Sequence, residues 1–99
     1  MRVTFDLHAS DDLDRIFAWI AKDNPRAASE MIARIEAKVM LLETPELAQM
    51  GRPGLVEGTR ELIEWPYIIV YRLDEKRNEI VVVAVMHGAQ DRERTDGSR

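Results

Sequence analysis

The chain has 99 residues, no cysteine, and 14 basic against 18 acidic residues, which gives a formal net charge of −4. A length of about 100 residues corresponds to one domain, and the lack of cysteine excludes disulfides and thiolate chemistry and is typical of a reducing compartment. Because the charge is negative, a general attraction to nucleic acid is not expected, and anion binding would need a local arrangement of cations.

The sequence contains neither a signal peptide nor a segment that could cross a membrane. Residues 1–6 lack the apolar run and the small-residue cleavage site of a signal peptide. The longest apolar run, residues 80–86, is far shorter than the roughly 20 residues that cross a bilayer. We therefore expect a cytoplasmic protein with no membrane partner.

The first half of the chain predicts one strand and two helices. Residues 3–7 alternate apolar and polar side chains, which predicts a strand. Ser10 is a candidate N-cap for a helix, and Asp11 and Asp12 would then lie in its first turn, where the helix dipole favours carboxylates. The Asn-Pro pair at 24–25 predicts the end of this helix and the start of the next. Because this junction is so short, the two helices must fold back as a hairpin.

The second half predicts a loop followed by three strands. Residues 46–58 contain three glycines and no apolar period, which predicts a loop. The expected strands are at 59–64, 67–73 and 79–86. Tight turns between them predict an antiparallel meander, so the expected fold is α+β, with an antiparallel four-stranded sheet packed on a two-helix hairpin (order β-α-α-β-β-β) within residues 1–88. The polar tail, 89–99, is expected to be flexible.

The last two predicted strands are apolar on both faces. Strict alternation places five of their side chains on one face: Ile68, Val70, Val81, Val83 and Val85. Strands of this kind are normally covered on both sides, whereas a two-helix hairpin covers only one. Either the 46–58 loop and the tail fold over the second face, or a protein partner does. We favour a partner bound to these five side chains or to the opposite face, because large apolar patches mark interaction sites.

Three arginines and one histidine are the constellation that suggests chemistry. Arg52, Arg60 and Arg72 could bind a phosphate or carboxylate through paired hydrogen bonds, and His87 could exchange a proton near neutral pH. Cleavage of RNA through its 2′-hydroxyl would use such a set, with a nearby glutamate as the base. The structural alternative is that the arginines pair with neighbouring carboxylates and that His87 only ends a strand.

No metal site and no cofactor are expected. The two histidines, His8 and His87, are far apart in the sequence, and cysteine ligands are missing. Neither a Walker-type phosphate loop nor a nucleophile elbow occurs in the sequence.

Six short segments between Val3 and Ala89 carry a family resemblance. They are Ala9–Leu13, Asn24-Pro25, Gly51-Arg52-Pro53-Gly54, Gly58–Leu62, Pro66–Arg72 and Val85–Ala89. Together they resemble the RelE/ParE superfamily of toxins from bacterial type II toxin–antitoxin systems, which include plasmid-stabilisation systems. The resemblance implies a cytoplasmic toxin that a cognate antitoxin holds inactive in a hetero-oligomer, with a segment of the antitoxin covering apolar surface of the toxin.

The resemblance implies one of two activities. RelE-like members are ribosome-dependent RNases that cut mRNA with basic residues and a C-terminal histidine or tyrosine, which here would be Arg60, Arg72 and His87. ParE-like members lack the full catalytic set and poison DNA gyrase. The chain has Gly88 where nuclease relatives often carry a tyrosine, and no lysine joins its arginines, so the resemblance favours a non-enzymatic gyrase inhibitor. Arg52, Arg60 and Arg72 would then contact the target or an anion. A non-toxic relative that only binds an antitoxin is the third possibility.

Overall fold

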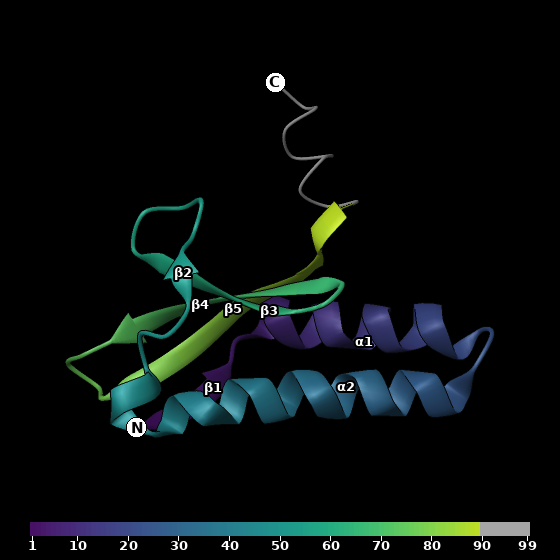
Figure 1. The fold of residues 1–99 in the computed structure, drawn as a ribbon, viewed down its shortest axis with the longest axis horizontal. Coiled ribbons are helices and arrows are strands. Elements are labelled where there is room, and N and C mark those ends of the chain that lie inside the picture. Colours follow the sequence, from purple (N-terminus) through teal and green to yellow (C-terminus); the bar gives the residue numbers. More distant parts are fainter. Residues whose placement is uncertain (90–99) are drawn as a thin grey trace.

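The computed structural model describes residues 1–89, and its strands form one five-stranded sheet (Figure 1). The elements are β1 (Arg2–Phe5), α1 (Leu7–Ala21), α2 (Pro25–Met40), the 3-10 turns η1 (Leu41–Glu43) and η2 (Pro45–Leu47), β2 (Arg52–Pro53), β3 (Thr59–Glu64), β4 (Tyr67–Asp74) and β5 (Glu79–His87). The strand order is β1-β5-β4-β3-β2, with β1 parallel to β5 and the other pairs antiparallel.

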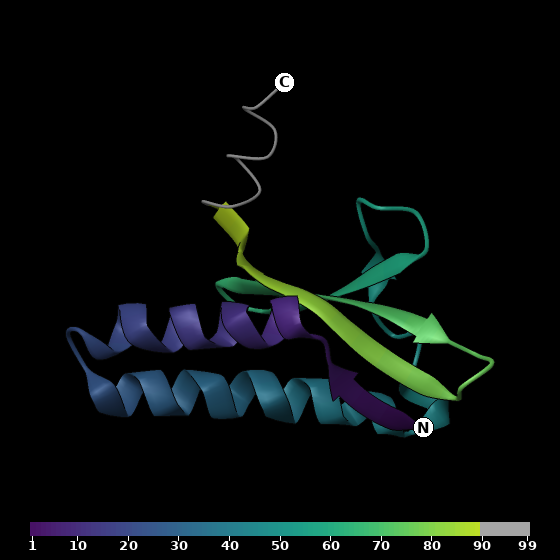
Figure 2. The same ribbon diagram turned by 180° about the vertical axis from the view of Figure 1, so that it is seen from behind.

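The α+β class and the helical hairpin are confirmed, but the prediction of four antiparallel strands is wrong. The additional strand, β2, has two residues and lies within the segment 46–58 that was predicted to be a loop. The edge strand β1 pairs in parallel with β5, because the two helices carry the chain across one face of the sheet before it returns (Figure 2). The helices therefore cover one face only, which leaves the other as a candidate binding surface.

Helix α1 begins earlier than predicted. Its N-cap is Asp6, whose side chain accepts a hydrogen bond from the Ala9 N–H at 2.9 Å, while Ser10 lies inside the helix. The N–H of Asp6 still donates to the Val82 carbonyl at 3.0 Å, so pairing with β5 holds this residue extended where the helix can start. The start of α2 is as predicted, since Asn24 caps it and proline is its first residue.

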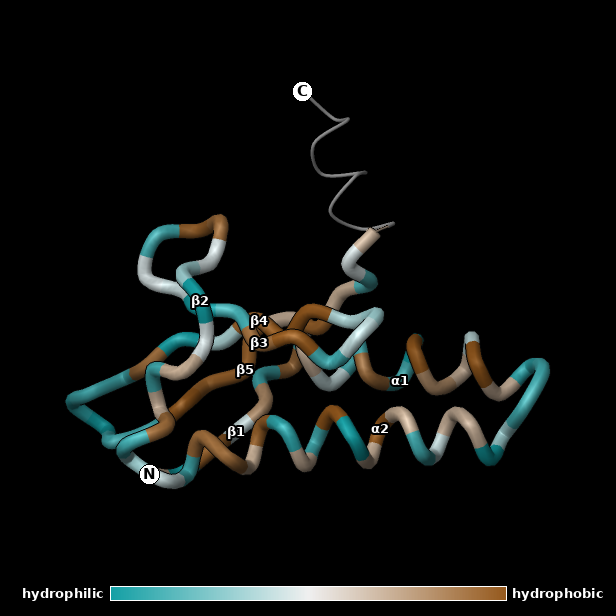
Figure 3. Tube along the Cα trace, in the orientation of Figure 1, coloured by the Kyte–Doolittle hydropathy of each residue, from teal (hydrophilic) through white to brown (hydrophobic). Residues whose placement is uncertain are grey.

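The core lies between the hairpin and one face of the sheet, which we call the helix-covered face. Its largest fully buried side chains are Ile35, Val39, Leu42, Ile69, Tyr71, Ile80 and Val82. The members from α2 recur at helical spacing and form one stripe, whereas those from β4 and β5 recur at alternate positions. The tube coloured by hydropathy shows that the central strands are the most continuously apolar part of the chain (Figure 3).

A bulge in β5 changes which of its side chains face the helices. The register shifts beside Val70 and Tyr71, which leaves Val83 without a partner on β4. Val85 is consequently turned into the core, where it is buried, while Val81 remains on the other face. The prediction that Val81, Val83 and Val85 share one face is wrong, because one extra residue inverts the alternation along the rest of the strand.

Residues 90–99 of the predicted tail lie outside the described residues. Within residues 1–89, no helix combines the length and apolarity that crossing a membrane requires. The same part of the chain holds no group of three or more side chains suited to binding a metal ion.

Candidate functional site

The strand register places Arg60 and Arg72 on opposite faces of the sheet. Arg60 is paired with Tyr71, and Thr59 is paired with Arg72. Because Tyr71 points into the core, Arg60 lies on the helix-covered face, and Arg72 lies exposed on the opposite face, which we call the open face. The two guanidinium groups that were predicted to share a phosphate therefore do not converge.

Arg60 holds the loop that precedes β2. Its guanidinium donates to the Gly51 carbonyl, while its buried Nε has no hydrogen-bond partner among residues 1–89. The buried hydroxyl of Tyr71 strengthens the same loop, since it accepts from the Gly51 N–H at 3.2 Å and donates to the Ala48 carbonyl at 3.0 Å. The position of Arg60 thus serves the packing of residues 48–51 against the sheet.

Arg52 forms an ion pair with the carboxylate of Glu61. Its Nε lies 3.1 Å from the Glu61 carboxylate oxygen, and the two residues are direct neighbours across β2 and β3. The Glu61 side chain is only 3 % exposed, so removal of Arg52 from it would leave a buried charge with less compensation. An anion arriving at Arg52 would have to compete with Glu61.

His87 lies at a distance from Arg60 along the sheet. It ends β5 opposite Tyr67, and the two rings pack edge to face with centroids 5.6 Å apart. Along β4, Tyr67 and the Arg60 partner Tyr71 are four residues apart, which is roughly 13 Å at about 3.3 Å per residue. The structure therefore does not bring His87, Arg60 and Arg72 together at one point.

The open face carries apolar side chains that the chain itself largely covers. Ile68, Val70 and Val81 are 5 %, 8 % and 7 % exposed, although they lie outside the main core cluster. The expectation that this face is left bare is wrong for these three residues. The exposed apolar surface lies instead at the rim of the open face, where Ile63 is 39 % and Trp65 is 70 % exposed.

A groove of about 360 Å³ follows this rim. It is lined by Arg52, Ile63, Trp65, Ile68, Gly88 and Ala89. Gly88 closes one side by donating its N–H to the Pro66 carbonyl at 2.7 Å, and a Cβ at this position would lie 3.2 Å from that carbonyl oxygen. A side chain there would require the segment or the β3–β4 turn to shift by a few tenths of an ångström. The groove is mainly apolar, with one guanidinium at its wall, which suits a protein segment better than an anion.

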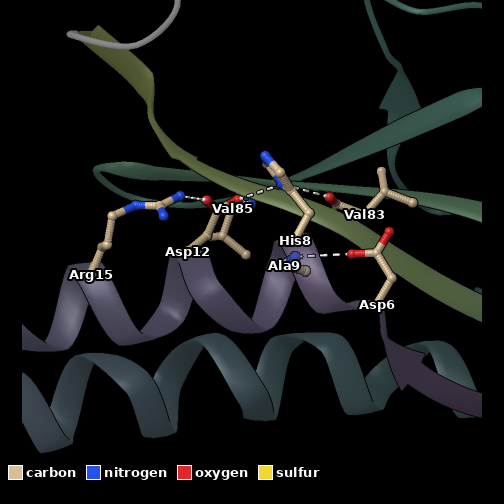
Figure 4. Close-up of polar contacts among 7 residues, drawn as sticks. All are labelled: Asp6, His8, Ala9, Asp12, Arg15, Val83 and Val85. Atoms are coloured by element: carbon tan, nitrogen blue, oxygen red, sulfur yellow. Dashed lines mark hydrogen bonds and ion pairs between the residues drawn. The ribbon is translucent and has the colours of Figure 1, made fainter.

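Asp12 has a role that its sequence position did not reveal. It lies in the first half of α1, and its side chain points towards Val85 of β5 (Figure 4). The side chain is only 9 % exposed. One carboxylate oxygen accepts the Val85 N–H at 2.9 Å, and the other contacts the Arg15 guanidinium. The Nδ1 of His8 lies 3.3 Å from Asp12 and 3.2 Å from the Val83 carbonyl.

The side chains of Asp12 and His8 contact the backbone of β5 where no strand pairs with it. The edge strand β1 ends at Phe5, opposite Val82, so the next backbone groups of β5 have no strand beside them on that edge. Asp12 from α1 accepts the N–H of Val85, and the Nδ1 of His8 lies within hydrogen-bond distance of the Val83 carbonyl. An unpaired strand edge is a site for unwanted strand pairing, and the helix closes it.

Comparison with known sequences identifies the family. The model of the ParE toxin of the type II toxin–antitoxin system parDE matches residues 3–92. A curated protein of Sinorhizobium fredii, "Putative toxin Y4kP", is 41 % identical over 91 residues, which is 90 % of each chain.

Solved structures agree with this result. A chain of the chromosomal ParDE TA system from P. aeruginosa has a TM-score of 0.74 and 26 % identity, with 88 % of this chain and 95 % of that chain covered. The toxin–antitoxin complex RelBE2 from Mycobacterium tuberculosis includes a chain with a TM-score of 0.60 and 25 % identity, with 87 % and 95 % covered. The chain described here therefore belongs to the ParE toxin family of type II toxin–antitoxin systems, within the RelE/ParE superfamily.

Proposed function

We propose that this toxin acts in the cytoplasm by inhibiting DNA gyrase without cleaving RNA, and that a cognate antitoxin neutralises it. Membership in the ParE family, and a higher TM-score with the ParDE chain than with the RelBE2 chain, support the ParE-like branch. The observation that carries the proposal is the separation of Arg60, Arg72 and His87 in the sheet.

An RNA-cleaving site needs its acid or base and its cations within hydrogen-bond reach of one phosphate. Here Arg60 is engaged with the Gly51 carbonyl on one face, and Arg72 lies on the other. His87 packs against Tyr67 at the end of β5. Bringing the three together would require a change of strand register, which would also expose core side chains. This geometry favours a toxin that acts by binding.

The groove beside the open face supports the antitoxin part of the proposal. Two exposed apolar side chains at its rim, Ile63 and Trp65, would be removed from water by a bound segment. A buried aromatic anchor of this kind contributes strongly to protein–protein binding. The solved relatives come from toxin–antitoxin systems, which is consistent with a hetero-oligomer.

A supercoiling assay with purified gyrase tests the target. We expect the wild-type chain to inhibit supercoiling of relaxed plasmid, and His87→Ala to inhibit equally, because His87 has no catalytic task in this mechanism. In a parallel translation reaction with ribosomes, mRNA should remain intact. If the chain cleaves mRNA, leaves gyrase active and loses cleavage in both His87→Ala and Arg60→Ala, it is a RelE-like endoribonuclease instead.

A further inference from the structure

The loop between β2 and β3 ends in two exposed aliphatic side chains, which we call the apolar tip. Its members, Leu55 and Val56, are 64 % and 68 % exposed. In both ribbon views the loop stands out from the sheet on the side away from the helices (Figures 1 and 2). Two adjacent branched side chains held in water at the end of a projecting loop form a convex apolar surface.

Local hydrogen bonds hold the apolar tip in one shape. The Gly54 N–H donates to the Thr59 carbonyl at 2.9 Å. The Thr59 N–H and hydroxyl both donate to the Val56 carbonyl, at 3.1 Å and 2.6 Å. Gly58 has a φ of 87°, a conformation that suits glycine, so the sequence is adapted to this turn. The exposure of the tip is therefore the product of a closed turn.

The base of the loop is also fixed. Arg52 is paired with Glu61, and the Arg60 guanidinium contacts the Gly51 carbonyl. Tyr71 binds Gly51 from within the core. The tip cannot fold back over the sheet without breaking these contacts, and within residues 1–89 both side chains remain exposed.

The side chains of the apolar tip are better suited to binding a protein than a nucleic acid. Glu57 is the only charged residue between Pro53 and Thr59, so the loop offers no cation to a phosphate backbone. A convex apolar surface is complementary to a concave apolar pocket, and preformed pockets belong to folded proteins. An extended antitoxin segment fits the groove at the rim of the open face instead, since that site is itself concave.

We propose that Leu55 and Val56 are the contact through which this toxin engages its target, by insertion into an apolar pocket of a folded protein with a basic residue at its rim facing Glu57. The identity of that protein as gyrase rests on the function proposed above. The assignment of the tip itself does not depend on it, because the same side chains should be required for toxicity towards any folded target.

The test compares the double variant Leu55→Ser/Val56→Ser with Leu7→Ser as a matched control. Leu7 is 77 % exposed at the start of α1 and lies outside both proposed surfaces. The concentration of chain that halves gyrase supercoiling should rise at least about tenfold in the double variant, as expected for loss of a hot spot. It should change by less than about twofold in the control. Urea midpoints of both variants should match the wild type, because the replaced side chains are exposed.

The other outcomes either overturn the proposal or move its test to growth arrest. A double variant that inhibits gyrase like the wild type overturns it. The proposal also fails if the wild type self-associates in sedimentation and the only change in the double variant is that it is a monomer. That result would mean that the tip binds a second copy of the chain. If the wild type leaves gyrase active, the proposed function fails, and growth arrest on induction then tests the role of the tip. The double variant should not arrest growth. Undiminished arrest by the double variant would refute the role of the tip. A wild type that neither inhibits gyrase nor arrests growth overturns both.

Discussion

Replacement of Asp12 by alanine should destabilise the fold strongly although the residue lies on a helix near the surface. The carboxylate accepts the buried Val85 N–H at 2.9 Å, and no neighbouring strand can take its place because β1 ends opposite Val82. In Asp12→Ala the Val85 N–H would lose its acceptor. The variant therefore reports directly on the closing of the β5 edge by α1.

The size of the effect follows from the partners of the carboxylate. A hydrogen bond to a charged group contributes about 1.5–3 kcal/mol, and an unsatisfied buried donor costs about 1–3 kcal/mol. The pairs with Arg15 and His8 add little, about 0–1 kcal/mol, because both partner side chains are 68 % exposed. We expect a loss of about 2–4 kcal/mol in the free energy of unfolding. The free energy of unfolding of a domain of this size is about 5–15 kcal/mol in total, and this loss lowers Tm by roughly 8–32 °C.

Urea denaturation followed by circular dichroism measures this loss. Asp11→Ala is the matched control, since Asp11 is the exposed neighbour on the same helix and should change stability by less than about 0.5 kcal/mol. If Asp12→Ala also stays within about 0.5 kcal/mol of the wild type, the carboxylate does not hold the β5 edge and this reasoning is refuted.

Three further substitutions test how the elements are held, each by urea denaturation. Tyr71→Phe should cost about 1–3 kcal/mol, because the buried hydroxyl serves two backbone groups of the 48–51 loop; an unchanged midpoint would contradict that role. Gly54→Ala should cost roughly 1–3 kcal/mol, since its Cβ would lie 2.2 Å from the Thr59 hydroxyl oxygen, and a neutral result would show that Thr59 turns away freely. Asn24→Ala should cost about 1 kcal/mol through loss of the α2 N-cap, whereas a stabilised variant would argue against the cap.

The helical hairpin could be predicted because its signals are local. The Asn-Pro pair at 24–25 both caps α2 and sets its first turn, and the apolar stripe of α2 shows at helical spacing. The start of α1 was not resolved in the same way, since Asp6 and Ser10 are both competent caps. The choice between them is made by the pairing of Asp6 with Val82, which is distant in sequence.

The bulge and its effect on β5 could not be predicted from the pattern of the strand. Val85 faces the core only because Val83 is an extra residue in the ladder. The group that binds the Val85 N–H, Asp12, is 73 residues away along the chain and looks like an ordinary first-turn carboxylate. With two residues, β2 was also too short to give a periodic signal.

The placement of Arg60 and Arg72 on opposite faces of the sheet could have been predicted from the sequence. The two-residue turn at 65–66 pairs Glu64 with Tyr67, and counting outward pairs Thr59 with Arg72. Arg60, one residue further along β3, must then face the other side of the sheet. The candidate catalytic set was assembled from residue type and missed this parity.

Induction of the chain alone in a bacterium, with the DNA-damage response and mRNA integrity measured in one culture, tests the proposed activity most directly. Poisoned gyrase should induce the damage response and arrest growth while transcripts keep their full length. Transcripts cut within minutes in cells that show no damage response would contradict the account.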